Sequence, residues 1–122
     1  MSYLTIYATR RLVAAPAPSK RARIDECLAL NLPGHHGDAA IRAFVEDTSR
    51  RRFRRQPPKP RIRLRISDCT NQISLAFEVD SPERRANALH KMDTLLGSLT
   101  RFRAAVEAEC ELYEHRCRHR QR

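Results

Sequence analysis

A long row of apolar residues follows Ser81 and constrains the fold of this chain more than any other feature. The row repeats at alternating intervals of four and three residues, with one four-residue stutter between Val106 and Cys110. Its members are Ala88, Met92, Leu95, Leu99, Phe102, Val106, Cys110, Tyr113 and Cys117. Ser81 supplies a cap, Pro82 fits the first helical position and Glu83 places an acid in the first turn. The pattern therefore predicts a helix from residue 82 to about residue 117.

This predicted helix is too long for one small domain. It would measure about 54 Å, whereas a compact body of 122 residues is only about 35 Å across. The helix must protrude, pack against a second copy, or bend, and a bend is easiest at Gly97. We expect a homodimer with a coiled-coil interface, and the alternative is a core helix of a single domain. The predicted interface residues are Met92, Leu95, Leu99, Phe102, Val106 and Tyr113.

A β-hairpin is predicted before the helix. In residues 61–68, isoleucine and leucine alternate with arginine, so one face is apolar and the other carries Arg61, Arg63 and Arg65. Residues 73–80 form the second predicted strand, and residues 67–72 form a polar turn. Pairing Leu64 with Leu75 gives the inner pairs Ile62–Phe77 and Ile66–Ile73. The same register gives the outer pairs Arg61–Glu78, Arg63–Ala76 and Arg65–Ser74.

The N-terminal part is predicted to hold one strand and one or two helices. Residues 3–9 alternate as a strand does, and residues 14–19 break regular structure because they contain two prolines. Residues 24–32 are expected to form a short helix. Asp38 can cap a second helix, whose apolar stripe is Ile41, Phe44, Val45 and Thr48. This helix would run into an arginine-rich stretch and end before Pro57.

The predicted elements define an α+β fold in which a β-hairpin packs on a long C-terminal helix, beside a small N-terminal strand/helix part. We expect residues 1–56 to form this N-terminal segment, which ends in a basic helix. Residues 57–60 are proline-rich and should form an extended linker. Residues 61–122 would hold the hairpin and the dimerisation helix.

The positive charge is concentrated in one half of the chain. Lys and Arg number 24 against 14 Asp and Glu, for a net charge of +10. Residues 1–66 hold 15 basic against 5 acidic side chains, whereas residues 67–122 hold 9 of each. Residues 50–65 alone carry nine basic side chains and no acid. So many like charges repel one another, and this repulsion costs stability unless a polyanion offsets it.

This basic stretch predicts a nucleic-acid-binding protein that contacts phosphates and reads bases little. DNA and RNA remain equally open as partners, and the alternative is an adaptor or assembly subunit that docks on an acidic protein. Phe53, inside the stretch, would either stack on a base or anchor the chain to the core. The candidate contact residues are Arg50, Arg51, Arg52, Arg54, Arg55, Lys59, Arg61, Arg63 and Arg65.

No sequence feature points to catalysis. The chain has three glycines and none of the common phosphate-loop, zinc-protease or hydrolase motifs, so we expect no enzyme activity and no cofactor. His35–His36 and the pair His115 and His119 lack further ligands at a workable spacing, so no metal is expected. The four cysteines show no disulfide pattern and should be free thiols. Without an apolar run of about 20 residues or a secretion signal, we expect an intracellular protein without a membrane partner, cytoplasmic or nucleoid-associated, or nuclear in a eukaryote.

Overall fold

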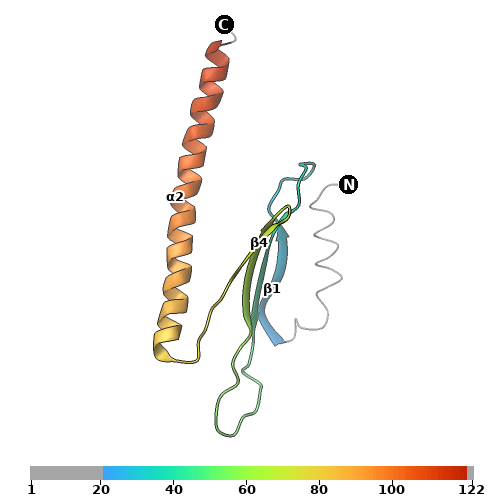
Figure 1. Cartoon of the computed structure of the whole chain (residues 1–122), viewed down its shortest axis with the longest axis vertical. Helices are drawn as coiled ribbons and strands as arrows, with labels where there is room; N and C mark the ends of the chain where they lie inside the picture. The colour runs from blue at the N-terminus through green and yellow to red at the C-terminus, as the bar shows by residue number, and fades with distance from the viewer. Residues whose placement is uncertain (1–20, 121–122) are drawn as a thin grey trace. The chain divides into compact units, whose positions relative to one another are not determined.

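The structure is a computed structural model and describes residues 21–120. Within that range it contains a four-stranded antiparallel sheet and one long helix, which confirms the predicted α+β class (Figure 1). The strands are β1 (Ala22–Ala29), β2 (Ala39–Glu46), β3 (Ile62–Asp68) and β4 (Asn71–Leu75), and they follow chain order across the sheet. The helix is α2 (Pro82–Arg120).

The predicted hairpin is present as β3 and β4, but its second strand is shorter than expected. Leu64 pairs with Leu75 and Ile66 with Ile73, as predicted. The paired residues end at Leu75, so the predicted pairs Ile62–Phe77, Arg61–Glu78 and Arg63–Ala76 are not part of the ladder. The turn is tighter than the predicted residues 67–72, because Asp68 already pairs with Asn71 and Cys69 takes a positive φ of 53°. Residues 76–81 then connect β4 to α2.

Both helices predicted between residues 24 and 56 are wrong. Residues 22–29 form β1, and residues 39–46 form β2, which pairs with β1 on one side and β3 on the other. The spacing of Ile41, Phe44 and Val45 fits a helical stripe, but Ile41, Ala43 and Val45 also alternate as strand residues do. Pairing with β3 selects the strand, because tertiary contacts override weak local preferences. The predicted strand at residues 3–9 and the break at residues 14–19 lie outside the described residues.

The arginine-rich stretch lies in a loop instead of at a helix end. Residues 47–61 connect β2 to β3 at one end of the sheet (Figure 1, green). The predicted linker at residues 57–60 falls within this loop, between two strands that pair directly. The chain divides into two compact units between Ser81 and Pro82.

The sheet has one apolar face. The strand register places on it Ile24, Leu28, Ile41, Val45, Ile62, Leu64, Ile66, Ile73 and Leu75. The members on the central strands β2 and β3 are half-buried, whereas Ile24, Leu28 and Ile73 on the outer strands are exposed. No large side chain within residues 21–120 is fully buried. The opposite face carries Asp25, Arg42, Arg63 and Arg65, whereas Glu26 and Asp68 lie on the apolar side.

The helix is continuous over 39 residues and passes through Gly97 without a break, which confirms the predicted long helix. At a rise of 1.5 Å per residue, it is about 58 Å long. Thr100 accommodates its hydroxyl within the helix by donating to the carbonyl of Leu96, 2.8 Å away. Within residues 21–120, no helix has both the length and the apolarity needed to cross a bilayer.

Candidate nucleic-acid interface

Three arginines from two strands share the polar face of the sheet. Arg63 and Arg65 project to one side of β3 because side chains alternate along a strand. Arg42 of β2 lies directly opposite Arg65, and Phe44 lies opposite Arg63, so both belong to the same face. Arg42 and Arg63 are exposed, and Arg65 is half-buried. We call Arg42, Arg63 and Arg65 the arginine face.

Arg42 is not among the predicted contact residues, because a helix over residues 38–56 would not bring it beside β3. The strand alternation is nevertheless visible in the sequence, since Ile41, Ala43 and Val45 form one apolar side and place Arg42 on the other. Strand pairing then brings Arg42 beside an arginine that is 23 positions later in the sequence.

The charges of the arginine face are not compensated within the described chain. Among residues 21–120, none of the three arginines has an ion-pair partner. Asp25 of β1 shares this face, but it lies opposite Phe44, which separates it from Arg63. Like charges directly opposite each other destabilise a strand pair, so the Arg42–Arg65 pair weakens the sheet in the absence of an anion.

Arg61 is at the end of the same face and is held more firmly. Its guanidinium lies 5.7 Å from the centroid of the Phe44 ring, which is within cation–π range. Its backbone carbonyl accepts a hydrogen bond from the amide of Glu46 at 2.8 Å. Arg61 makes these contacts with β2 in place of the predicted cross-strand pair with Glu78.

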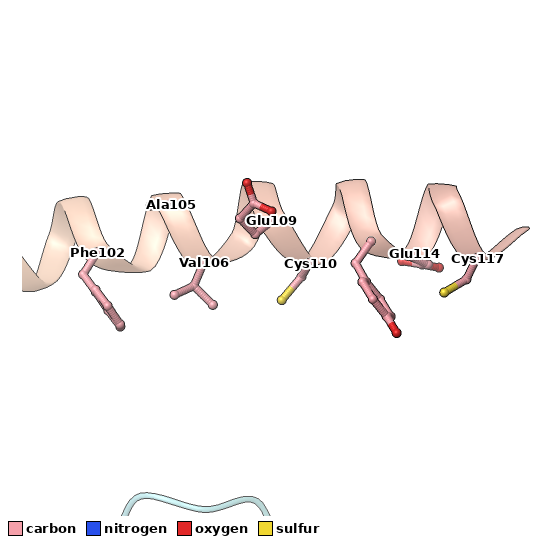
Figure 2. A pocket seen from close by; sticks show the side chains of 8 residues that line it. Phe102, Ala105, Val106, Glu109, Cys110, Glu114 and Cys117 are labelled. Atoms are coloured by element: carbon pink, nitrogen blue, oxygen red, sulfur yellow. The ribbon is translucent and has the colours of Figure 1, made fainter. Parts of the chain in front are cut away.

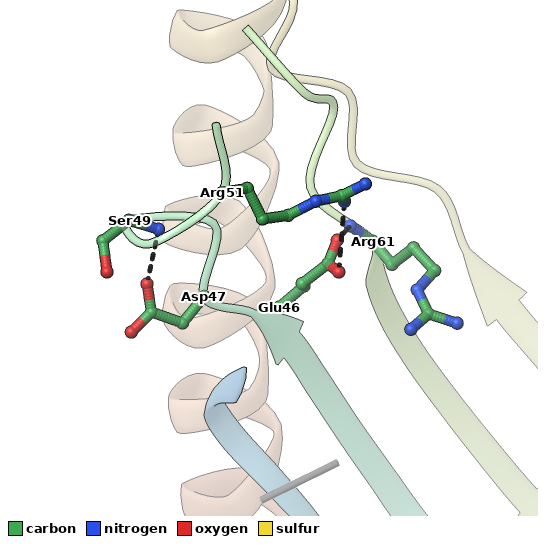
Figure 3. Close-up of polar contacts among 5 residues, drawn as sticks. All are labelled: Glu46, Asp47, Ser49, Arg51 and Arg61. Atoms are coloured by element: carbon green, nitrogen blue, oxygen red, sulfur yellow. Dashed lines mark hydrogen bonds and ion pairs between the residues drawn. The ribbon is translucent and has the colours of Figure 1, made fainter. Parts of the chain in front are cut away.

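Glu46 closes the arginine-rich loop (Figure 3). This residue is only 8% exposed. One carboxylate oxygen accepts a hydrogen bond from the backbone N–H of Arg61, with N and O 3.0 Å apart. The other accepts a hydrogen bond from Nη1 of Arg51 at 3.4 Å. Glu46 therefore ties both ends of the loop together and partly neutralises Arg51.

Asp47 orders the first turn of the loop. Its carboxylate accepts the backbone N–H of Ser49 at 2.9 Å and lies 3.4 Å from Nη2 of Arg23. The hydrogen bond from the Ser49 amide is the main reason that the pKa of Asp47 lies below its ordinary value of 3.8, and the Ser49 side chain and the nearby charges of Arg23 and Arg50 lower it further.

The remaining basic residues of the loop fall into two groups. Lys59 is engaged by Asp80, with Nζ and Oδ2 separated by 3.1 Å. The other four arginines are exposed and have no ion pair within residues 21–120; they are Arg50, Arg52, Arg54 and Arg55. Phe53 is 58% exposed, so its ring is available for stacking and does not anchor the loop in a core.

The predicted dimer residues lie along α2. Met92 and Leu95 are half-buried, and the other four are exposed; these are Leu99, Phe102, Val106 and Tyr113. Three of them, Phe102, Val106 and Tyr113, line an open apolar strip on one side of the helix together with Cys110 and Cys117 (Figure 2). The strip belongs to α2 alone and is separate from the arginine face in the sequence and in the division into units.

The described chain offers little for metal chemistry. His115 and His119 meet edge to face with ring centroids 4.3 Å apart, beside Arg116 and Arg118. Within residues 21–120, no three His, Cys, Asp or Glu side chains are grouped as metal ligands. All four cysteines are free thiols. Comparison with protein-family models, curated proteins and solved structures yields no match to this chain.

Proposed function

We propose that the chain binds nucleic acid by contacting phosphates through the arginine face and the adjoining loop. The observation that supports this most directly is the Arg42–Arg65 pair, two guanidinium groups on facing strand positions with no ion-pair partner among residues 21–120. A bound polyanion would convert this repulsion into attraction, and guanidinium groups suit phosphate because they can donate two parallel hydrogen bonds.

The spacing of the arginine face suits a phosphate backbone. Side chains two residues apart on a strand are about 6.6–6.8 Å apart, which is close to the distance between successive phosphates of one strand. Arg63 and Arg65 can therefore reach neighbouring phosphates, and Arg42 adds a contact from the next strand of the sheet. These contacts involve no base edges, so we expect binding with little dependence on sequence.

The loop extends this surface. Arg61 stands at the end of the arginine face, and it is also the last residue of the loop that carries the four exposed arginines. Phe53 adds an exposed ring among them, and a ring of this kind can stack on an unpaired base. The long arginine side chains of the loop can therefore make further phosphate contacts. Glu46 holds the two ends of the loop beside the sheet.

Salt-dependent titration tests the proposal. A labelled duplex and a labelled single strand are titrated with wild type and with the double variant Arg63→Ala/Arg65→Ala at several salt concentrations. Each lost phosphate contact lowers the log–log salt slope by about 0.9 on duplex DNA and about 0.7 on a single strand. The double variant should therefore bind all sequences more weakly. The magnitude of its log–log salt slope should be smaller than that of wild type by between about one and two.

A variant of equal charge change serves as the control. Arg118→Ala/Arg120→Ala removes two arginines at the end of α2, far along the sequence from the sheet. It should affect binding less than the strand variant does. An equal effect would leave only a general charge attraction. If wild type binds neither nucleic acid at about 50 mM salt, the proposal is wrong and an acidic protein becomes the partner to seek.

A further inference from the structure

The apolar strip on α2 carries large exposed side chains. Phe102 is 66% exposed and Tyr113 is 72% exposed. Figure 2 shows Phe102, Val106, Cys110 and Cys117 projecting from the same side of the helix. We propose that this strip is the interface of an antiparallel homodimer, in which two copies of α2 run in opposite directions and meet at Val106. This proposal does not depend on nucleic-acid binding.

The spacing of the apolar row is symmetric about Val106. Toward the N-terminus, the row reaches Phe102, Leu99 and Leu95 at intervals of four, three and four residues. Toward the C-terminus, the intervals are again four, three and four, and the row reaches Cys110, Tyr113 and Cys117. The stutter between Val106 and Cys110 creates this symmetry, because an unbroken heptad would place the next apolar residue three positions after Val106.

An antiparallel pair centred on Val106 uses this symmetry fully. Each residue before Val106 then lies level with the residue equally far after Val106 in the other copy. Phe102 faces the partner's Cys110, Leu99 faces the partner's Tyr113, and Leu95 faces the partner's Cys117. Two of these three levels thus pair a large side chain with a small thiol, which favours close packing of the two helices.

The apolar row also stays on one side of a straight helix. From Ala88 to Cys117 it covers about eight turns at 3.6 residues per turn. A strict heptad row of this length would drift by about 20° per heptad and would require the helices to supercoil. The stutter offsets the drift, so two straight helices of the observed kind can keep their strips in contact.

The charges of α2 favour the antiparallel direction. Four acids follow the centre, namely Glu107, Glu109, Glu111 and Glu114, and two bases precede it, Arg101 and Arg103. In the antiparallel pair, the acidic stretch 107–114 lies level with residues 98–105 of the other copy, which contain both arginines. In a parallel pair in register, every acid would lie level with the same acid of the other copy. Such like-charge contacts oppose assembly.

One ion pair adjoins the centre directly. Arg103 Nη1 lies 2.9 Å from Glu107 Oε2, and each residue follows a member of the apolar row by one position, so both flank the strip on the same side. Two-fold symmetry through Val106 brings this pair beside its copy. The resulting cluster alternates in sign, because Arg103 approaches the partner's Glu107 and Glu107 approaches the partner's Arg103.

Cysteine cross-linking of the full chain tests the direction and the register. The background variant Cys27→Ser/Cys69→Ser/Cys117→Ser retains only Cys110. In the antiparallel dimer, the two Cys110 residues are eight positions apart along the axis, about 12 Å, which is too far for a disulfide. Mild oxidation should therefore leave this variant uncrosslinked on a non-reducing gel. Adding Phe102→Cys places a thiol level with the partner's Cys110 and should produce a covalent dimer.

Matched controls exclude other pairings. Replacing Cys110 by Ser in the Phe102→Cys variant should abolish the cross-link, and adding Leu95→Cys to the background in place of Phe102→Cys should not produce one. Val106→Cys, with all four native cysteines replaced by Ser, should cross-link to its own copy at the two-fold axis. Wild type should sediment as a dimer at tens of micromolar.

Three results would overturn the proposal. Cross-linking of the background variant through Cys110 alone would indicate a parallel dimer. Failure of Val106→Cys to cross-link would exclude the centre at Val106. Sedimentation of wild type as a monomer at tens of micromolar would exclude the dimer itself.

Discussion

Arg42 and Arg65 occupy directly opposite positions on the neighbouring strands β2 and β3. Neither has an ion-pair partner among residues 21–120, and Arg42 is exposed to solvent. Two like charges at facing positions cost stability, and an anion that contacts both removes this cost. The same pair should therefore connect the stability of the sheet to anion binding.

Arg42→Thr should stabilise the free protein and weaken its binding to nucleic acid. The substitution removes the repulsion with Arg65 and leaves a residue that suits strands, so the free energy of unfolding should rise by about 0.5 kcal/mol. Arg63→Thr is the matched control, because Arg63 faces Phe44 and not a like charge. Urea denaturation and titration of both variants provide the measurements. An equal change in the free energy of unfolding of the two variants would contradict the repulsion.

Glu46→Gln should destabilise the sheet unit. The variant keeps the shape of the side chain but loses the charge-assisted hydrogen bonds to Arg51 and to the backbone of Arg61. Because Glu46 is buried, we expect the free energy of unfolding to fall by about 1–3 kcal/mol. Asp93→Asn, at an exposed helix position, should change it by less than about 0.5 kcal/mol. Similar urea midpoints for the two variants would show that Glu46 does not hold the loop.

Asp47→Asn should change how stability depends on pH. Folding lowers the pKa of Asp47, chiefly through the Ser49 amide, so the folded protein favours the ionised carboxylate. This contribution is fully present above the ordinary pKa of 3.8 and is lost as pH falls through the lower folded value. The variant should be less stable than wild type at pH 7, and the difference should shrink below about pH 3. A constant difference between urea midpoints at pH 7 and pH 2.5 would contradict this.

Gly97→Ala should stabilise α2. Gly97 lies inside a continuous helix, where alanine is favoured by about 1 kcal/mol. A Cβ at this position would approach Nη1 of Arg101 at 3.3 Å, and this flexible side chain can move aside. Thermal unfolding followed by circular dichroism should show a higher Tm. A lower Tm would indicate that this position needs glycine for a contact outside α2.

The sequence by itself determined the elements whose pattern is complete within one segment. The alternation of arginine with isoleucine and leucine in residues 61–66 is sufficient for β3 and for the shared face of Arg63 and Arg65. The apolar row and the cap at Ser81 are sufficient for α2 and for its passage through Gly97. In both cases, the periodicity over many residues outweighs the preference of any single one.

Only the tertiary structure decided β1, β2 and the composition of the arginine face. Residues 39–46 satisfy a helical stripe and a strand alternation almost equally well, and hydrogen bonds to β3, a distant segment, select the strand. The same pairing brings Arg42 to Arg65 and allows the buried Glu46 to bind Arg51 and Arg61. Local periodicity cannot specify these relationships, because strand pairing depends on partners that are far apart in the sequence.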